Sequence, residues 1–361
     1  MSSTASDLSP KRAGIVGVSG YSGMELARIL ASHPHFSLGL VTSDKWAGKR
    51  LGAHIAVAAP AADLSCFSHE QGQAHLGEVD VVFLCTPAEV SVELAPRALA
   101  AGARAVDLSG GFRLAAEQFP QWYGFTHPAP ELLAQAVYSL PEATNNGEKL
   151  RTARLVSNPG CYATASVLAV LPLLRAGFME SDSVIIDAKS GTTGAGRKAN
   201  EEMSFSEVAD DVRAYRVFRH QHAPEIERAL GLGGTPHVRV TFIPHLLPVR
   251  RGILATAYGR LRHGTGGRDP AGGVRKALAD FAEERTFVRV VAPEEVRLQA
   301  AVGTNRVVLG ASADARLGMV VSFAAIDNLI KGAAGQAVQN ANLMFGFPEA
   351  AGLCGLAGAM P

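Results

Sequence analysis

A glycine-rich turn near the start of the chain places the strongest limit on its fold. Residues 13–18 are apolar enough for a short buried strand, and residues 24–32 have the pattern of a helix. Between them, Gly17, Gly20 and Gly23 form a G-x-x-G-x-x-G spacing. In a strand–turn–helix unit, such glycines let the backbone approach a pyrophosphate at the helix N-terminus. The turn therefore predicts a dinucleotide-binding domain, and a glycine-rich turn without a ligand is the alternative.

Strands and helices alternate through the first half of the chain. Strand patterns occur at 36–42, 79–84 and 104–108, and a helix is expected at 90–101. The 79–84 run is continuously apolar, which is typical of a parallel strand buried on both faces. This alternation predicts a Rossmann-type, doubly wound parallel sheet with ligands at the carboxyl ends of its strands.

The pattern changes after residue 184, where strands follow one another and one clear helix, at 274–284, lies among them. The expected strands are at 184–189, 238–242, 253–258, 287–291, 306–309 and 319–325. We therefore expect an α/β protein whose second domain is α+β, with a mainly antiparallel sheet.

Charge and cysteine content exclude several classes of protein. The 34 Lys and Arg residues balance 33 Asp and Glu residues, to a net charge of +1, which does not suggest nucleic-acid or membrane binding. The four cysteines are too far apart for a disulfide framework or a zinc cluster, so we expect no metal and a reducing, cytoplasmic environment. Residues 1–10 are too short and weakly basic for a targeting peptide.

A cysteine follows a sharp turn in the middle of the chain. Residues 155–156 end a strand, Asn158, Pro159 and Gly160 form the turn, and a helix follows Cys161. At a helix N-terminus, free N–H groups and the helix dipole favour thiolate over thiol, so Cys161 is a candidate nucleophile. The alternative is a small core residue, because free cysteine is often buried.

His222 lies in a stretch that suits a base. Pro224 is a typical first helical residue, which places His222 just ahead of a helix N-terminus, where the dipole keeps imidazole neutral. A structural histidine and a zinc pair formed with His220 are the alternatives, although no further ligands complete a zinc set.

The end of the second strand indicates which dinucleotide is bound. Ser43, Lys45, Lys49 and Arg50 suit a 2′-phosphate, whereas Asp44 suits the free ribose hydroxyls of NAD. The balance favours NADP(H).

Two further stretches are candidates for binding an anion. Arg113 follows the end of the 104–108 strand, where it could hold a phosphate through two hydrogen bonds or simply be solvated. The loop 190–198 is rich in glycine and hydroxyl groups and contains two cations, although a flexible surface loop would look similar.

Several separated stretches together resemble the N-acetyl-gamma-glutamyl-phosphate reductase family of arginine biosynthesis, which is related to aspartate-semialdehyde dehydrogenase. They occur in the family's order at 20–26, 107–109 with 112–114, 157–164, 187–198, 220–227, 244–248 with 251–252, and 327–346. The family's nucleophile falls on Cys161 and its acid/base histidine on His222. The resemblance implies an NADP-dependent, phosphorylating semialdehyde dehydrogenase that forms a homodimer or homotetramer.

The resemblance and the motifs together divide the candidate residues by role. The expected cofactor-binding residues are Gly17, Ser19, Gly20, Tyr21, Ser22, Gly23, Ser43, Lys45, Thr86, Pro87, Gly194 and Asn328. The expected substrate and phosphate residues are Arg113, Asn158, Ser190, Gly191, Arg197, Glu225 and Arg251.

The implied reaction is the NADPH-dependent reduction of N-acetyl-L-glutamyl 5-phosphate to its semialdehyde through a Cys161 thioester. Reductases of aminoadipyl phosphate or aspartyl phosphate are alternatives within the superfamily. A Cys-His hydrolase and a non-catalytic NADP-binding regulator are alternatives from other classes.

These expectations give the following domain limits. Residues 1–11 are a disordered tail, residues 12–160 bind NADP, and residues 161–327 form the catalytic, substrate and oligomerisation domain. A C-terminal helix at 328–361 completes the first domain.

Overall fold

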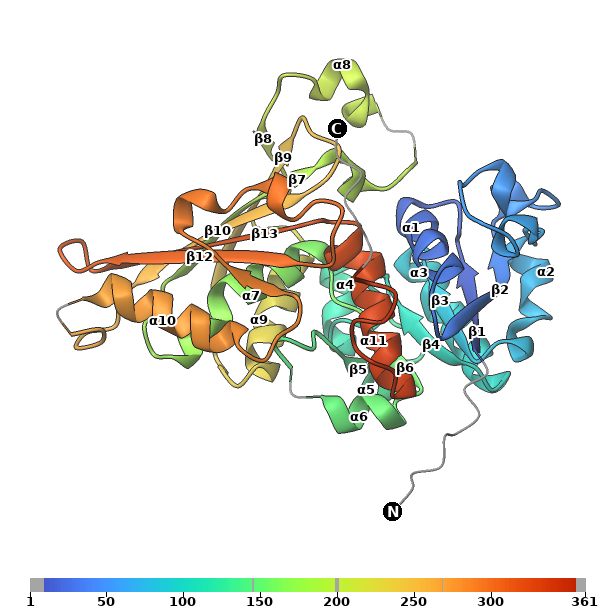
Figure 1. Cartoon of the computed structure of the whole chain (residues 1–361), viewed down its shortest axis with the longest axis horizontal. Coiled ribbons are helices and arrows are strands. Elements are labelled where there is room, and N and C mark those ends of the chain that lie inside the picture. The colour runs from blue at the N-terminus through green and yellow to red at the C-terminus, as the bar shows by residue number, and fades with distance from the viewer. Residues whose placement is uncertain (1–9, 145, 199–200, 268, 355–361) are drawn as a thin grey trace.

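The computed structural model describes residues 10–144, 146–198, 201–267 and 269–354. Two β-sheets lie side by side, and helix α11 (Gly335–Phe345) lies between them (Figure 1). The expected class, a parallel Rossmann-type sheet beside a mainly antiparallel one, is confirmed. Within these ranges, no helix has the length and apolar character needed to cross a membrane.

The first sheet contains six parallel strands in the order β2-β1-β3-β4-β6-β5. Their bounds are β1 Lys11–Val16, β2 Phe36–Thr42, β3 Val81–Leu84, β4 Arg104–Asp107, β5 Val137–Tyr138 and β6 Leu155–Ser157. The helices of this half are α1 Tyr21–Ala31, α2 His69–Gln73, α3 Ala88–Ala100, α4 Phe119–Trp122, α5 Pro130–Gln135 and α6 Gly147–Thr152. β3 is buried throughout and β1 is buried from Ala13 onward, which explains their apolar sequences there.

The glycine-rich turn joins β1 to α1 and packs tightly against the loop after β3. Gly17 has φ +91°, which favours glycine, and a Cβ there would lie 2.7 Å from the Cys85 carbonyl oxygen. A Cβ at Gly23 would lie 2.5 Å from the Gly17 carbonyl oxygen. These two glycines are therefore required by packing within the protein, whereas Gly20 lines an open cavity.

The second sheet contains seven strands in the order β11-β12-β13-β10-β7-β9-β8. Four neighbouring pairs are antiparallel, while β7 with β9 and β11 with β12 are parallel. Its strands are β7 Val184–Gly191, β8 Arg213–Ala214, β9 Val240–Leu247, β10 Ile253–Arg260, β11 Val288–Val290, β12 Val307–Asp314 and β13 Met319–Ile326. The helices α9 (His222–Leu232) and α10 (Pro270–Ala282) lie on one side of this sheet, and α8 (Phe205–Val208) lies near its β8 edge (Figure 1).

Helix α7 (Cys161–Arg175) is the core of the second half. Every residue from Tyr162 to Leu174 is buried, because the sheet, α9 and α10 surround the helix. This explains why its sequence is apolar on all sides. The first residue of α7 is Cys161, so the packing of this helix fixes the position of the candidate nucleophile.

The C-terminal segment returns to the first sheet. A π-helical turn, Ile330–Ala334, leads into α11, which packs against α1, α6 and β4. Arg251, from the second half, forms ion pairs with Glu25 of α1 at 3.0 Å and with Asp327 at 3.1 Å. The two halves are thus joined by a buried helix and by a charged contact.

Several predicted boundaries are wrong. The tail predicted for 1–11 includes Lys11, which begins β1 and donates its N–H to His35; residues 1–9 lie outside the described ranges. The helix predicted for 328–361 ends at Phe345, since Gly346 adopts a left-handed conformation and turns follow it. Residues 355–361 also lie outside the described ranges.

Candidate active site

A cavity of about 730 Å³ opens where the two halves meet. The glycine-rich turn and the loop after β3 form one side, and the loop after β7 and the start of α9 form the other. Cys161, at the start of α7, lies in the same cavity. A nucleotide site and a nucleophile therefore share one space.

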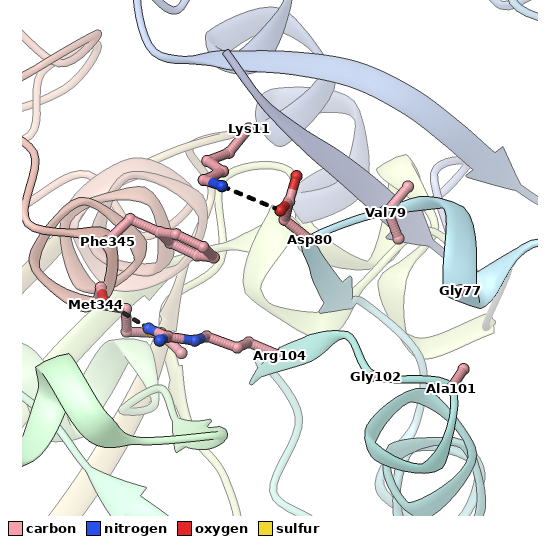
Figure 2. Close-up of a pocket in the computed structure, with 9 residues that line it drawn as sticks. All are labelled: Lys11, Gly77, Val79, Asp80, Ala101, Gly102, Arg104, Met344 and Phe345. Atoms are coloured by element: carbon pink, nitrogen blue, oxygen red, sulfur yellow. Dashed lines mark hydrogen bonds and ion pairs between the residues drawn. The ribbon is translucent and has the colours of Figure 1, made fainter. Parts of the chain in front are cut away.

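A second cavity, of about 540 Å³, lies at the opposite, amino-terminal ends of β1, β3 and β4 (Figure 2). Its charged side chains are paired: Lys11 Nζ lies 3.4 Å from Asp80 Oδ1, and Arg104 Nη1 donates to the Met344 carbonyl at 2.6 Å. Arg104 also stacks on the Phe345 ring. These paired groups stabilise the amino-terminal ends of the strands. The first cavity is therefore the candidate active site.

Cys161 is the first residue of α7, as the sequence predicts, but its environment does not favour a thiolate. Burial raises the pKa of the thiol to about 11, and the nearby Arg113 charge and backbone N–H groups offset only part of this effect. Cys161 is nevertheless partly exposed to the cavity. The helix N-terminus lowers the thiol pKa, as expected, but burial has the larger effect and raises it overall.

His222 approaches the turn that precedes Cys161. Its imidazole packs so closely on Gly160 that a Cβ at that position would overlap Nε2. Burial, followed by the charge of Arg113, lowers the pKa of His222 to about 3, so the ring is neutral. The neutral state is the one predicted, but burial rather than the helix dipole is its main cause. His222 is itself the first residue of α9, and Pro224 is the third.

The Glu225 carboxylate supports the turn that precedes Cys161. This carboxylate is fully buried and accepts hydrogen bonds from the Gly160 N–H at 2.7 Å and the Tyr138 hydroxyl at 3.0 Å. It also lies 3.5 Å from Arg113 and 3.8 Å from His222. Glu225 was predicted to bind substrate; the structure instead places it behind the turn, where it orients Gly160 and His222.

Arg113 is buried rather than exposed at a loop. Its Nε donates to the Asn158 carbonyl at 2.9 Å, and its Nη2 donates to the Leu108 carbonyl at 2.8 Å. Its Nη1 faces His222 at 3.4 Å and borders the cavity. A two-pronged phosphate clamp, as predicted, would require donors that are already used.

Two other predicted substrate residues point away from the cavity. The Asn158 side chain accepts from Asn340 at 3.0 Å and donates to the Ala333 carbonyl, so it anchors the turn to the C-terminal segment. Arg251 is occupied by its ion pairs with Glu25 and Asp327. Neither residue lines the cavity.

Ser190 and Gly191 line the cavity, as predicted, but Arg197 lies on the nucleotide side. Its guanidinium donates to the Ser19 carbonyl at 3.1 Å and lies 5.6 Å from the centre of the Trp46 ring. Arg197 therefore extends from the second half toward the glycine-rich turn, on the side of the cavity opposite the predicted substrate residues Ser190 and Gly191.

The predicted nucleotide residues that line the cavity come from both of its sides: the glycine-rich turn and the loop after β3 supply most of them, and Gly194 and Asn328 come from the second half. Gly20, Tyr21, Ser22, Thr86, Pro87, Gly194 and Asn328 line the cavity. Ser43 Oγ donates to Ser19 Oγ at 2.8 Å, and Lys45 is exposed beside them. Asp44 accepts the His69 N–H at 2.8 Å. The Asn328 amide is partly occupied, since its oxygen accepts from Gly252 and its nitrogen donates to Thr193.

Sequence reasoning missed several residues of the cavity wall, namely Arg213, Tyr215, Arg216, Gly332 and Ala333, and considered His220 only as a zinc ligand. Tyr215 donates to the Tyr162 hydroxyl at 3.2 Å, and His220 Nδ1 accepts from the His222 N–H. Burial lowers the pKa of His220 to about 2. These residues follow no regular spacing, so no motif points to them. No cluster of three potential metal ligands occurs in the described ranges.

Comparison with known proteins defines the class of this enzyme. Residues 12–153 match the semialdehyde dehydrogenase NAD binding domain, and residues 161–328 match the semialdehyde dehydrogenase dimerisation domain. The fold is similar to aspartate semialdehyde dehydrogenase II complexed with ASA from Vibrio cholerae, with a TM-score of 0.72 and 17% identity over 93% of this chain and 98% of that one. Aspartate semialdehyde dehydrogenase with NADP from Candida albicans gives a TM-score of 0.70 and 17% identity, covering 92% and 98%. The protein is a semialdehyde dehydrogenase-type oxidoreductase that uses a nicotinamide dinucleotide.

Sequence identity narrows the assignment further. The N-acetyl-gamma-glutamyl-phosphate reductase of Symbiobacterium thermophilum is 44% identical over 350 residues, which cover 95% of this chain and 97% of that protein. The chain belongs to the N-acetyl-gamma-glutamyl-phosphate reductase family.

Proposed function

We propose that the protein reduces N-acetyl-L-glutamyl 5-phosphate to N-acetyl-L-glutamate 5-semialdehyde and phosphate, with NADPH, in arginine biosynthesis. One observation carries the chemistry: Cys161 begins a buried helix in the cavity that the glycine-rich turn also lines, and the neutral His222 ring lies against the preceding Gly160. This arrangement suits covalent catalysis followed by reduction.

The residues of the glycine-rich side fit a dinucleotide. A Cβ at Gly20 would meet nothing closer than 3.5 Å, so the cavity leaves room above the start of α1 for a pyrophosphate. The Ser19 and Ser43 hydroxyls, Lys45 and Arg197 supply donors and positive charge suited to a 2′-phosphate. The Asp44 carboxylate accepts from His69, which supports NADP over NAD. When bound, NADPH supplies the hydride.

In this mechanism one proton moves between the Cys161 thiol and the His222 imidazole. Cys161 Sγ attacks the acyl carbonyl carbon, a C–S bond forms, and the C–O bond to phosphate breaks with its electron pair leaving on phosphate, which takes up a proton from solvent. The thiol proton moves to the His222 imidazole. After reduction of the thioester, the C–S bond breaks and sulfur recovers that proton, which releases the aldehyde.

The two pKa values constrain the timing of this transfer. A thiol with a pKa of about 11 beside an imidazole with a pKa of about 3 does not ionise spontaneously at pH 7. We therefore place proton transfer and attack on the carbonyl in the same step. Free N–H groups at the start of α7 stabilise the developing oxyanion, an effect of about 10²–10³-fold in rate per donor.

The negatively charged groups of the substrate contact the side of the cavity that lies opposite the glycine-rich turn. Arg213 and Arg216 line it together with Ser190 and Gly191, and Arg113 Nη1 borders it beside His222. Arg216 and Arg113 supply donors to the phosphate and carboxylate of the substrate, whereas the Arg213 guanidinium already donates to Asp211 and to the Glu202 and Glu207 carbonyls. Substrates that differ by one methylene are distinguished by only about 1–3 kcal/mol in an apolar pocket, so the aminoadipyl homologue stays an alternative substrate.

The reverse reaction tests this proposal. Purified protein is given phosphate and NADP⁺ with N-acetylglutamate semialdehyde, its aminoadipate homologue or aspartate semialdehyde, and NADPH formation is followed. The proposal predicts phosphate-dependent NADPH formation with the first substrate. Preference for another substrate would reassign the pathway. No turnover with any of them, in a folded protein, would favour a hydrolase or a regulator.

A further inference from the structure

A fully buried lysine immediately precedes a glycine that packs against Cys161. Lys331, in the π-helical turn Ile330–Ala334, has no exposed surface. Its Nζ donates to Glu142 Oε1 at 2.6 Å, to Gln336 Oε1 at 2.6 Å and to Gln339 Oε1 at 2.8 Å. All three N–H donors of the ammonium group are therefore used inside the protein.

The π-helical turn has an unusual register. Gly332 donates its N–H to the Asp327 carbonyl, and Ala334 donates to the Leu329 carbonyl, each at 2.9 Å and five residues back. Such turns contain one residue more than the α-helical spacing and occur often at functional sites. Relaxation to α-helical spacing would change which residue of the turn faces α7.

The residue that faces α7 is Gly332, and the fit is tight. A Cβ at Gly332 would lie 2.7 Å from Cys161 Cβ and 3.1 Å from Cys161 Cα. Any side chain at this point would displace the candidate nucleophile. The register of the turn therefore determines where Cys161 lies in the cavity.

Lys331 ties this turn to a second element of the site. Glu142 follows Tyr138, whose hydroxyl donates to Glu225, and Glu225 in turn accepts from Gly160. The Lys331–Glu142 ion pair thus connects the π-helical turn, which contacts Cys161, to the segment 138–142, which contacts Glu225 and through it the Gly160 N–H. A buried ion pair is often no more stabilising than apolar side chains of similar volume, whereas its geometry is specific.

We propose that Lys331 is a positioning residue for the nucleophile: its buried ion pair with Glu142 holds the π-helical turn in the register that presses Gly332 against Cys161. The proposal rests on the nucleophilic role proposed above for Cys161, and it concerns a residue that touches neither substrate nor cofactor.

The test is the double variant Lys331→Met/Glu142→Leu, which removes both charges and keeps apolar volume, so that neither charge is left buried alone. We expect the double variant to unfold cooperatively and to bind NADP⁺ with wild-type affinity. Its kcat should be about 10²-fold lower with an unchanged KM, because a displacement of the nucleophile by about 1 Å has an effect of this size. The pH profile of Cys161 alkylation by iodoacetamide, followed by peptide mass, should also change. Glu349→Gln is the matched control, because Glu349 accepts from Gln339 Nε2 at 2.7 Å and its substitution leaves the three acceptors of Lys331 Nζ in place, so it should leave kcat unchanged.

Wild-type kcat and a wild-type alkylation profile in the folded double variant would overturn the proposal. If that variant does not fold, Lys331→Gln/Glu142→Gln, which also removes both charges but keeps polar side chains, is compared in the same two assays and judged in the same way. The two proposals fail separately: turnover by Cys161→Ser would overturn the thioester mechanism alone, whereas the alkylation profile reports on the position of Cys161 whether or not it is the nucleophile.

Discussion

At the scale of single residues, Cys161 and His222 are both held uncharged by the protein around them. Burial opposes the thiolate and the imidazolium alike, and the positive charge of Arg113 favours the first and opposes the second. In the free protein at neutral pH, Cys161 is therefore a thiol and His222 a neutral imidazole. In the proposed mechanism, proton transfer is therefore coupled to attack on a bound substrate.

This resting state has a measurable pH dependence. Because the pKa of the Cys161 thiol is raised to about 11 from 9.0, its thiolate fraction at neutral pH is lower than that of an ordinary cysteine. Alkylation of Cys161 by iodoacetamide should be slow at pH 7 and should still be rising above pH 9. Peptide mass in a Cys354→Ser background measures this, since Cys354 is exposed. A rate that reaches its plateau below pH 8 would contradict the assignment.

Substitution of His222 separates chemistry from binding. His222→Asn removes the proton acceptor and should lower kcat by about 10²–10⁴-fold, the usual contribution of general acid–base catalysis. The affinity for NADP⁺, measured by calorimetry, should be unchanged. A loss of thermal stability with little change in kcat would instead show that His222 is structural.

The sequence predicts best those residue positions that follow from local structure. Cys161 lies at a turn followed by a helix, a pattern readable over eight residues. Asn158, Glu225 and Arg251 were predicted to bind substrate but do not line the cavity, and their partners, such as Asn340 and Asp327, are remote in sequence. A polar side chain in a motif does not show whether it faces the cavity or anchors the motif from behind.

At the scale of elements, the glycine-rich turn contains glycines with two different roles. Gly23 is required by packing, since a Cβ would lie 2.5 Å from the Gly17 carbonyl oxygen, whereas Gly20 has space on the cavity side. Gly23→Ala should lower the free energy of unfolding by about 1–3 kcal/mol, as for overpacking elsewhere. Gly20→Ala should leave stability nearly unchanged and weaken NADP⁺ binding.

Thermal unfolding and NADP⁺ titration of both glycine variants check this prediction. Equal losses of stability would show that the distinction between the two positions is wrong. Unchanged cofactor affinity in Gly20→Ala would remove this glycine from the nucleotide site.

Element prediction from sequence succeeded where the hydrophobic period was undisturbed. β2 has the predicted bounds, and β3 and β4 differ by only one or two residues at an end. β9 extends through Pro244, past its predicted end at 242, since a sheet tolerates proline where no ladder hydrogen bond is lost. The π-helical turn was predicted as ordinary helix, because apolar spacing alone does not reveal an inserted residue.

At the scale of the whole molecule, the second sheet keeps one side that its helices do not cover. Ile185 and Tyr258 are directly opposite each other on β7 and β10, and they are 47% and 38% exposed. Exposed apolar pairs of this kind are typical of interfaces between proteins. The region that matches a dimerisation domain includes both residues. We therefore expect this side to contact a second copy of the chain.

Negative charge at residues 185 and 258 should weaken the contact between two copies of the chain. Ile185→Asp/Tyr258→Asp places two like charges opposite each other, so sedimentation velocity should show a smaller assembly than the wild type. Leu317→Asp is a control, since Leu317 is 59% exposed and lies between β12 and β13. An unchanged sedimentation coefficient in the double variant would exclude this side as the interface.

The thioester on Cys161 is the central chemical claim, and a phosphate-free single turnover tests it most directly. Protein is mixed with N-acetylglutamate semialdehyde and NADP⁺, NADPH absorbance is followed, and the Cys161 peptide is weighed after acid quench. Without phosphate to release the acyl group, we predict a burst of about one NADPH per subunit, a matching acyl adduct on Cys161, and steady turnover when phosphate is added. Phosphate-dependent turnover with neither burst nor adduct would contradict the thioester mechanism.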